Sequence, residues 1–301
     1  MSIPIYHILE QINHIEYIGN PNQVIKQIIQ LDVNNTNSDV LFWCHDKNLE
    51  KLYQIQYGTV ICSPNIDKLQ LNSNCNYIIV ESPRSVFQQV LKHFFINEIE
   101  KTIAKSAKIH PSVILGKDVL IGENVVIEEG SQIGDDAIIL HNTVIFRNSI
   151  IGNHVVVGAN CTIGGTGFGY ERNEKGDYQF IPHIGNVIIK DHVEIGQNSC
   201  VDRGVIGSTI LHENVKIDNL VHIAHGVEVD KNTLITANSM IAGSAKIGHD
   251  VWIAPSSSVM NNKSVGDHAF LGMGAVVLKD VGDNEVVVGN PAKLLRTNKQ
   301  E

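Results

Sequence analysis

The sequence has few of the features that mark secreted, membrane-spanning or nucleic-acid-binding proteins. Five cysteines in 301 residues, an odd number without a Cys-x-x-Cys pair, argue against a disulfide framework or a zinc site. No apolar run is long enough to span a bilayer, and the N-terminus lacks a basic leader with a cleavage site. The net charge of -9 disfavours nucleic acid as the main partner. We therefore expect a cytoplasmic protein, in which a local basic patch would still suit a phosphate-bearing small molecule.

An aliphatic residue instead recurs at every sixth position through most of the chain. These anchors run without a slip through residues 103–163, resume at 189–201 and, after a four-residue insertion, continue through 211–277. A small or β-branched residue, such as Val113, stands two positions before most anchors, and glycine, such as Gly116, follows many of them. Glycine supplies backbone freedom for a sharp corner. The pattern predicts short strands joined by corners, in coils whose open edges must be covered by stacking.

This hexad is typical of the hexapeptide-repeat acyltransferases, which the sequence closely resembles, and the resemblance implies a left-handed parallel β-helix. The expected fold is therefore mainly β. Residues 1–100 mix apolar runs with helical patterns and predict a small α/β domain. The resemblance implies that this domain binds the nucleotide sugar. The β-helix follows over 101–280 and a tail over 281–301. A long aromatic-bearing loop at 164–188 interrupts the β-helix, and such an excursion is usually functional.

Short motifs in the repeat region resemble one family more closely. In chain order they are GFGY (167–170), IP followed by a glycine (181–185), VEIG (193–196), VDRG (201–204), IDN (217–219), IAH (223–225), IAGSAKIG (241–248) and GMG (272–274). Together they are similar to motifs of the bacterial UDP-3-O-(3-hydroxyacyl)glucosamine N-acyltransferases of lipid A synthesis and of related nucleotide-sugar enzymes. The resemblance covers nearly the whole chain. It implies an enzyme that transfers an acyl group to a sugar amine.

The resemblance also implies a catalytic pair. The histidine of the IAH motif is the general base of the family and maps to His225, and the aspartate of IDN that orients it maps to Asp218. A neutral imidazole at His225 can accept a proton at pH 7, which agrees with this role. The alternative is that His225 is a solvated corner residue, as we expect for most of the 14 histidines. A second histidine of the family's acyl site falls on Asn262.

The N-terminal region resembles the uridine-binding domain of the family, with departures. The family's stacking aromatic fits Phe42, while the expected Asn and Tyr fall on His45 and Asn48. We therefore expect thymidine-linked sugars to bind at least as well as uridine-linked ones, with the thymine methyl near Trp43. The alternative is that Phe42 belongs to the core of a strand. The residues assigned to the sugar substrate are Phe42, His45, Phe168, Tyr170, Asp202, Asn219 and His222.

The chain ends in a different manner from the lipid A enzyme. Its VVGNPAK segment at 287–293 resembles the coenzyme A-dependent sugar acetyltransferases, and no counterpart of the helical extension that meets acyl carrier protein is expected. Lysine as a point charge and arginine as a planar fork suit the phosphates of coenzyme A, although an ordinary cationic tail would look the same. The residues assigned to the acyl donor, with the Gly243 N–H also facing the oxyanion, are Gly243, Gly272, Gly274, Lys279, Lys293 and Arg296.

The predicted function is an N-acyltransferase that moves an acyl group from acyl-coenzyme A to the amine of a nucleotide-linked amino-dideoxy sugar, with thymidine as the favoured base. One alternative is the lipid A enzyme itself, with acyl carrier protein as donor. Another, of a different class, is a nucleotide-sugar-binding solenoid without catalysis. We expect no permanently bound cofactor and no metal, with acyl-coenzyme A as cosubstrate, and from the resemblance we expect a homotrimer.

Overall fold

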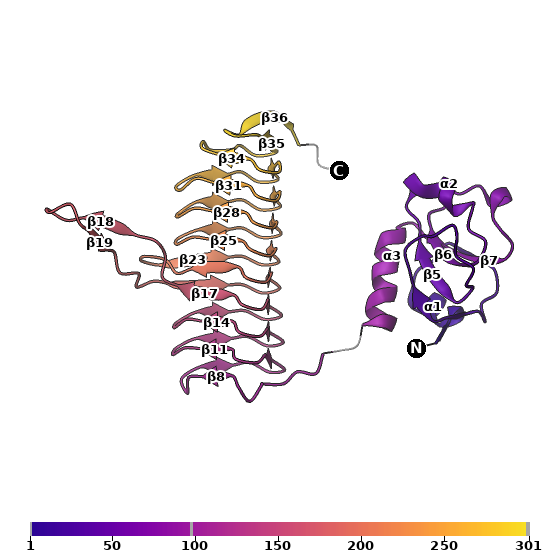
Figure 1. The fold of residues 1–301 in the computed structure, drawn as a ribbon, viewed down its shortest axis with the longest axis horizontal. Helices are drawn as coiled ribbons and strands as arrows, with labels where there is room; N and C mark the ends of the chain where they lie inside the picture. The colour runs from indigo at the N-terminus through magenta and orange to yellow at the C-terminus, as the bar shows by residue number, and fades with distance from the viewer. Residues whose placement is uncertain (1, 97–98, 299–301) are drawn as a thin grey trace. The chain divides into compact units, whose positions relative to one another are not determined.

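The computed structural model describes residues 2–96 and 99–298 and divides into two compact units, Met1–Ile99 and Glu100–Glu301 (Figure 1). The N-terminal unit has an α/β architecture, and the C-terminal unit is a solenoid. Among the described residues, no helix combines the length and the apolar character needed to cross a membrane.

The N-terminal unit is built on a five-stranded sheet with the order β2-β7-β6-β5-β4, in which only the β2–β7 pair is antiparallel. Its strands are β2 (Glu16–Ile18), β4 (Gln27–Ile28), β5 (Val40–Trp43), β6 (Gly58–Cys62) and β7 (Cys75–Ile79), with a separate pair, β1 (Ile3–Pro4) and β3 (Val24–Ile25). Its helices are α1 (Ile5–Gln11), η1 (Asp46–Asn48), α2 (Leu49–Leu52), η2 (Lys68–Gln70), α3 (Pro83–Val90) and η3 (Leu91–Phe95). One apolar cluster packs against each face of the sheet.

The side chains of β5 alternate between these two clusters because successive residues of a strand point to opposite faces. Leu41 joins the cluster that contains Ile61, whereas Phe42 joins the opposite one and is fully buried. Trp43, at the end of the strand, stays partly exposed and stacks on Phe87 with ring centroids 6.2 Å apart. Of the two neighbouring aromatics, Trp43 is therefore the one that keeps part of its surface exposed.

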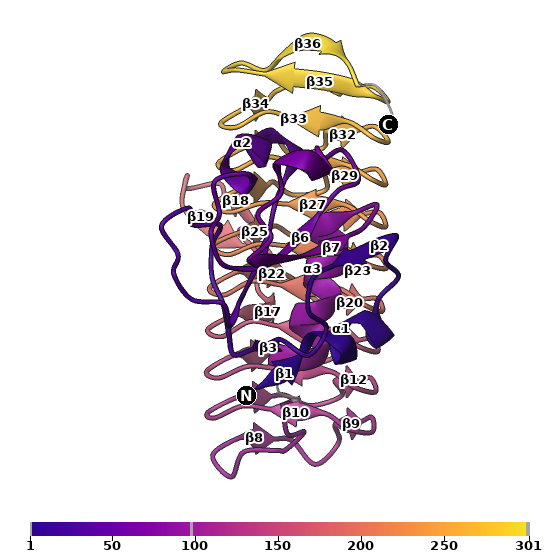
Figure 2. The ribbon, with the colours of Figure 1, turned by 90° about the vertical axis from the view of Figure 1, so that its right-hand side faces the viewer.

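The C-terminal unit is a parallel β-helix, which confirms the predicted fold class (Figures 1 and 2). Each coil contributes one short strand to each of three sheets, here called the first, second and third faces. Equivalent residues of successive coils pair in register, as Ile121 does with Ile139 and Ile127 with Ile145. The first face is closed at the C-terminal end by an antiparallel pair, β35 and β36.

The strands of each face are as follows. The first face comprises β10 (Leu120–Ile121), β13 (Ile138–Ile139), β16 (Val156–Val157), β21 (Glu194–Ile195), β24 (Lys216–Ile217), β27 (Leu234–Ile235), β30 (Trp252–Ile253), β33 (Phe270–Leu271), β35 (Glu285–Val288) and β36 (Lys293–Thr297). The second comprises β8 (Lys108–Ile109), β11 (Val126–Ile127), β14 (Val144–Ile145), β17 (Thr162–Gly165), β22 (Cys200–Asp202), β25 (His222–Ile223), β28 (Met240–Ile241), β31 (Ser258–Val259) and β34 (Val276–Val277). The third comprises β9 (Ile114–Leu115), β12 (Gln132–Ile133), β15 (Ile150–Ile151), β20 (Asn186–Ile189), β23 (Ser208–Leu211), β26 (Glu228–Val229), β29 (Lys246–Ile247) and β32 (Ser264–Val265).

The aliphatic anchors fill the interior of the solenoid. Ile145, Ile163, Ile223 and Ile253 are completely buried and belong to one continuous apolar cluster. Full burial of such a side chain contributes about 1.5–3 kcal/mol, so the repeated anchor stabilises every coil. The residue before each anchor points outward, which leaves one position per strand free for function.

The corners correct one expectation about glycine. Residues with left-handed backbone conformation, such as Asn124, Asn142 and Asn160 with φ of 57°, 60° and 59°, turn many of the corners. Their side chains also form ladders, in which Asn124 Nδ2 donates to Asn142 Oδ1 at 3.1 Å. Gly116 is needed for a different reason: a Cβ there would stand 2.5 Å from the carbonyl carbon of Gly134 in the next coil. Close stacking, rather than backbone freedom, requires these anchor-following glycines.

The excursion predicted at 164–188 leaves the solenoid after β17 and carries the hairpin of β18 (Tyr170–Arg172) and β19 (Tyr178–Phe180), which projects from the coils in Figure 1. Arg203 holds the start of the excursion. Its buried guanidinium donates from Nε to the carbonyl of Gly164 at 2.7 Å and from Nη2 to the carbonyl of Arg147 at 3.2 Å. The arginine of the VDRG motif therefore has a structural role at this junction.

Candidate active site

His225 lies at the corner that follows β25, on the edge between the second and third faces. It is half-buried, and neither ring nitrogen has a hydrogen-bond partner among the residues that the structure describes. Gly243, one coil further, packs against the ring: a Cβ there would stand 2.6 Å from Cε1 and 2.7 Å from Nε2. The backbone N–H of Gly243 is also unpartnered within the described chain. A free imidazole therefore lies beside a free backbone donor.

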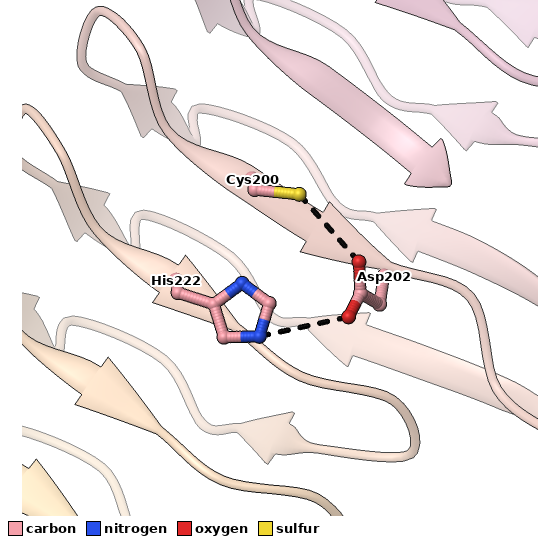
Figure 3. A group of neighbouring side chains, drawn as sticks. All are labelled: Cys200, Asp202 and His222. Carbon is pink, nitrogen blue, oxygen red and sulfur yellow. Dashed lines mark hydrogen bonds and ion pairs between the residues drawn. The ribbon is translucent and has the colours of Figure 1, made fainter. Parts of the chain in front are cut away.

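The carboxylate on the same edge is Asp202, at the end of β22. It is 6% exposed. Its Oδ2 lies 3.6 Å from Nε2 of His222, and its Oδ1 accepts from the thiol of Cys200 at 3.5 Å (Figure 3). Cys200 and His222 are neighbours in the parallel ladder of the second face, which explains why both side chains reach the same carboxylate.

The predicted orienting residue, Asp218, lies elsewhere. It follows β24 and so stands at the corner before β25, whereas His225 stands at the corner after it. Its oxygens accept from the backbone N–H groups of Asn219 at 2.7 Å and Ala237 at 3.1 Å, and the Asn219 side chain accepts from the Gln197 N–H at 2.7 Å. Asp218 and Asn219 thus stabilise a different edge, which corrects the expectation that Asp218 orients His225 within one chain.

The electrostatic surroundings favour a neutral imidazole at His225. Burial lowers the pKa of His225, and the nearby imidazoles of His183 and His222 lower it further, while Asp202 acts in the opposite direction. Burial raises the pKa of Asp202, although His222 and the other nearby groups partly offset this effect. Because a general base must be unprotonated, the lowered pKa suits His225 to accept a proton at neutral pH.

The Cys200, Asp202 and His222 side chains place their donor atoms within 4.8 Å of one another, a spacing compatible with a metal ion. Burial and the neighbouring carboxylate, however, raise the pKa of the Cys200 thiol to about 12. In this arrangement the thiol donates to the Asp202 carboxylate, so the residues form a hydrogen-bonded group on the edge of His225.

A second such cluster lies on the edge between the third and first faces, away from His225. The His249 ring faces Asp250 at 2.8 Å and Asp267 at 3.0 Å, and His268 stands edge-on at 4.8 Å between centroids. The hydrogen bond to Asp250 is the largest cause of a raised pKa at His249. Both nitrogens of His249 are engaged by carboxylates, so the arrangement is an ion-pair cluster of the solenoid corner.

One residue of this site was missed by the sequence analysis. His183, on the returning segment of the excursion, is buried and meets the ring of His225 edge to face, with centroids 5.4 Å apart. Gly167 of the GFGY motif packs against both side chains, since a Cβ there would stand 3.0 Å from Nε2 of His183 and 3.1 Å from Cβ of His225. In the sequence, this histidine directly follows the IP dipeptide at 181–182.

The predicted aromatic contacts lie further out on the excursion. Phe168 is 85% exposed, and Tyr170 contacts it with ring centroids 5.0 Å apart and Phe180 at 5.6 Å. These rings form an apolar cluster beside the segment that carries Gly167. Their assignment to the substrate remains a prediction.

The predicted base-stacking residue, Phe42, has no exposed ring face, and this corrects its assignment. A cavity of about 360 Å³ instead lies at the carboxyl ends of the parallel strands β5, β6 and β7, and its lining includes Trp43, His45, Asn65 and Arg84. Ligands of open parallel sheets bind at this end of the strands. His45 thus keeps its predicted place beside a candidate ligand site, whereas Asn48 belongs to η1 and does not line the cavity.

The residues predicted to bind the acyl donor are distributed over two edges. Asn262 and Lys279 lie on the edge of His225, since the N–H of Asn262 donates to the carbonyl of Gly243 at 3.0 Å and Lys279 follows β34. Gly272 and Gly274 follow β33 and lie on the edge of Asp218. Lys293 and Arg296 are exposed on β36, at the end of the first face. The fold does not bring the last four residues to the corner of His225.

The β-helix of hexads and the imidazole on one of its edges agree with an acyltransferase of the hexapeptide-repeat class, and the comparisons with known proteins test this class. Two family models match: the bacterial transferase hexapeptide (six repeats) over residues 208–243, and the GMPPB C-terminal domain over residues 98–167. The chain belongs to the UDP-3-O-acylglucosamine N-acyltransferase family, which confirms the predicted resemblance. It is 40% identical over 292 residues to the enzyme of that name from Campylobacter lari, covering 93% of this chain and 90% of the relative.

Further comparisons agree with this assignment. The UDP-3-O-acylglucosamine N-acyltransferase of Caulobacter sp. is 40% identical over 134 residues, which cover 44% of this chain and 39% of that protein. The solved UDP-N-acetylglucosamine acyltransferase of Bacteroides fragilis is 23% identical with a TM-score of 0.60 and covers 65% of this chain and 74% of its own. The corresponding O-acyltransferase of Moraxella catarrhalis is 26% identical with a TM-score of 0.53, covering 65% and 75%. The Bacteroides likeness shows the fold alone.

Proposed function

We propose that this protein transfers an acyl group from acyl carrier protein to the sugar amine of UDP-3-O-acylglucosamine. The observation that carries the proposal is the 40% identity to the Campylobacter lari enzyme, because it extends over 93% of the chain and so includes both units. This supports the alternative of lipid A synthesis over the prediction of a thymidine-linked sugar with coenzyme A. The position of Lys293 and Arg296 on β36, away from the corner of His225, is consistent with that choice.

The proposed chemistry is aminolysis of a thioester. The amine nitrogen attacks the thioester carbonyl, the C–S bond breaks, and a proton passes from the amine to His225 and then to the leaving thiolate. General base catalysis of this kind contributes roughly 10²–10⁴-fold to the rate. Asp202 would stabilise the transient imidazolium, and the unpartnered N–H of Gly243 would donate to the oxyanion of the tetrahedral intermediate.

We assign the uracil ring to the cavity beside Trp43 in the N-terminal unit. Trp43 offers a partly exposed aromatic surface, His45 and Asn65 offer polar edges, and Arg84 offers a cation for phosphate. Stacking of a base on an aromatic side chain is worth about 1–3 kcal/mol. This assignment moves the stacking role from Phe42 to its neighbour. We also propose that the protein acts as a homotrimer, as expected from its resemblance to the family.

The test is a matrix of two acceptors and two donors with the purified protein. UDP-3-O-acylglucosamine and a thymidine-linked amino-dideoxy sugar would each be incubated with acyl carrier protein thioester and with acyl-coenzyme A, and products identified by mass spectrometry. We expect N-acylation of the uridine-linked sugar, with kcat/KM at least ten-fold higher for the carrier-linked donor. Preferred turnover of the thymidine-linked sugar with acyl-coenzyme A would instead support a coenzyme A-dependent N-acyltransferase of thymidine-linked sugars. Binding of either sugar without release of free thiol from any donor would favour a non-catalytic solenoid.

A further inference from the structure

His183 is buried at the base of an otherwise exposed excursion. It is 6% exposed, whereas Phe180 and Ile184 on either side are 43% and 77% exposed. Its ring stacks on Phe180, with centroids 5.7 Å apart and 12° between planes, and its edge meets His225. The folded excursion therefore places a second imidazole next to the proposed base.

The hydrogen bonds of His183 fix the chemical character of its exposed nitrogen. Nδ1 lies 2.8 Å from the carbonyl oxygen of Ile181. Because a carbonyl can only accept, Nδ1 carries a proton, and in the neutral ring Nε2 then carries a lone pair. Within the described residues, Nε2 of His183 is a buried side-chain atom without a hydrogen-bond partner. A buried acceptor without a donor costs folding free energy and is rare in folded proteins. A bound ligand that donates a hydrogen bond to this atom would remove that cost.

The imidazoles of His183 and His225 face different neighbouring residues. Gly167 packs against Nε2 of His183 and against the Cβ and Cδ2 edge of His225, whereas Gly243 packs against the Cε1 and Nε2 end of His225. The amine that gives its proton to His225 is therefore not the group that satisfies His183. A second donor on the same substrate would supply the partner of His183 once the Gly167 segment, which packs against Nε2, moves aside.

We propose that Nε2 of His183 accepts a hydrogen bond from a free ring hydroxyl of the glucosamine substrate and thereby positions the sugar for attack. This inference rests on the proposed function and deepens it. In UDP-3-O-acylglucosamine the 3-oxygen is acylated, the 2-position holds the amine and the anomeric oxygen holds the diphosphate, which can only accept. The 4- and 6-hydroxyls are the remaining donors of the ring. A neutral acceptor suits such a neutral donor.

The test compares three variants that separate the acceptor from packing. His183→Phe keeps an aromatic ring to stack on Phe180 but removes both nitrogens, and His183→Gln restores an acceptor oxygen near the Nε2 position. Phe180→Leu disturbs the stacking and keeps the acceptor, so it is the control for a loosened excursion. Each protein would be titrated calorimetrically with UDP-3-O-acylglucosamine and with its 4-deoxy and 6-deoxy analogues, in the absence of acyl donor.

We expect His183→Phe to raise the Kd of the intact sugar about 5–10-fold, the effect of one hydrogen bond. The KM of the acyl donor should not change. His183→Gln should recover part of the lost affinity for the sugar. One deoxy analogue should bind the wild type as weakly as the intact sugar binds His183→Phe, with no further loss in that variant. The inference would be overturned if His183→Phe and Phe180→Leu lost the same affinity for the intact sugar, or if His183→Phe lost further affinity with both deoxy analogues. In either case, turnover by the wild type would still support the proposed function. A wild type that neither binds nor acylates the intact sugar would overturn the proposed function and this inference with it.

Discussion

Gly243 packs so closely against the imidazole of His225 that a Cβ on the glycine would stand 2.7 Å from Nε2. The two residues come from corresponding corners of successive coils, and the N–H of Ser244 donates to the carbonyl of His225 at 2.9 Å. Because this contact follows from the stacking of coils, the position of the imidazole and that of the neighbouring backbone donor are fixed together.

Gly243→Ala should therefore impair catalysis more than stability. The new methyl group would displace the imidazole, and loss of a positioned base costs about 10²-fold or more in kcat. The matched control is Gly282→Ala, in which the nearest atoms to the added Cβ are 3.3–3.6 Å away on the side chain of Glu285. Steady-state kinetics and thermal melts of both variants decide the matter. If Gly243→Ala keeps wild-type kcat, the ring is not held where we place the reaction.

His225→Ala should retain the wild-type Tm within a few degrees and lose at least about 10²-fold in kcat, because a half-buried corner residue contributes little packing. In the wild type, kcat/KM should be flat at neutral pH and fall on the acid side. The base works when unprotonated, and burial lowers its pKa below 6.5, so the fall should begin below pH 6.5. If the pH profile of kcat/KM has the same acid limb in His225→Ala, a group other than His225 causes that limb.

Asp202→Asn and Asp218→Asn form a matched pair. Asp202 raises the pKa of His225, so its loss should move the acid limb of kcat/KM to lower pH and reduce the plateau, whereas Asp218→Asn should leave the limb in place. Burial raises the folded-state pKa of Asp202, so its ionised form opposes folding above that pKa and the cost vanishes as pH falls below the unfolded value. Asp202→Asn should thus melt no lower than the wild type at pH 7.5. If instead Asp218→Asn shifted the acid limb and Asp202→Asn did not, Asp218 would be the carboxylate that acts on His225.

Trp43→Ala should affect ligand binding, whereas Phe42→Ala should affect stability. Trp43→Ala should weaken UDP binding by about 1–3 kcal/mol with little loss of stability, since it removes a stacking surface. Phe42→Ala should instead lower the free energy of unfolding by about 3–5 kcal/mol, the cost of a cavity at a fully buried aromatic. Calorimetric titration with UDP and urea unfolding of both variants measure these effects. A folded Phe42→Ala that loses UDP affinity while Trp43→Ala binds normally would reverse the assignment.

The repeat and its fold follow from the sequence alone. An aliphatic residue at every sixth position is compatible with a coil of three short faces, and a single coil cannot bury its own anchors, so stacking is required. The position of His225 at a corner also follows, because its distance from the anchor Ile223 is fixed by the hexad. The family motifs then associate that corner with acyl transfer.

Tertiary structure decided the partners of His225. Asp218 precedes β25 and Asp202 ends β22, and only the stacking of one coil on the next determines which carboxylate shares an edge with the imidazole. The family resemblance assigned this role to Asp218, seven residues from His225, and not to the more distant Asp202. His183 could not be placed from the hexad, because the excursion leaves the repeat and is held by contacts outside it, such as that of Arg203 with the Gly164 carbonyl.

The same division holds in the N-terminal unit. The run DVLFWC predicts a buried strand, and a strand must alternate its side chains between two faces. Which of Phe42 and Trp43 points into the core depends on the residues that cover each face of the sheet, and these come from segments far away in the chain. Local pattern thus determined the strands, the coils and the corner of the proposed base. Long-range packing decided which aromatic is accessible, which carboxylate shares an edge with the histidine and which second histidine stands beside it.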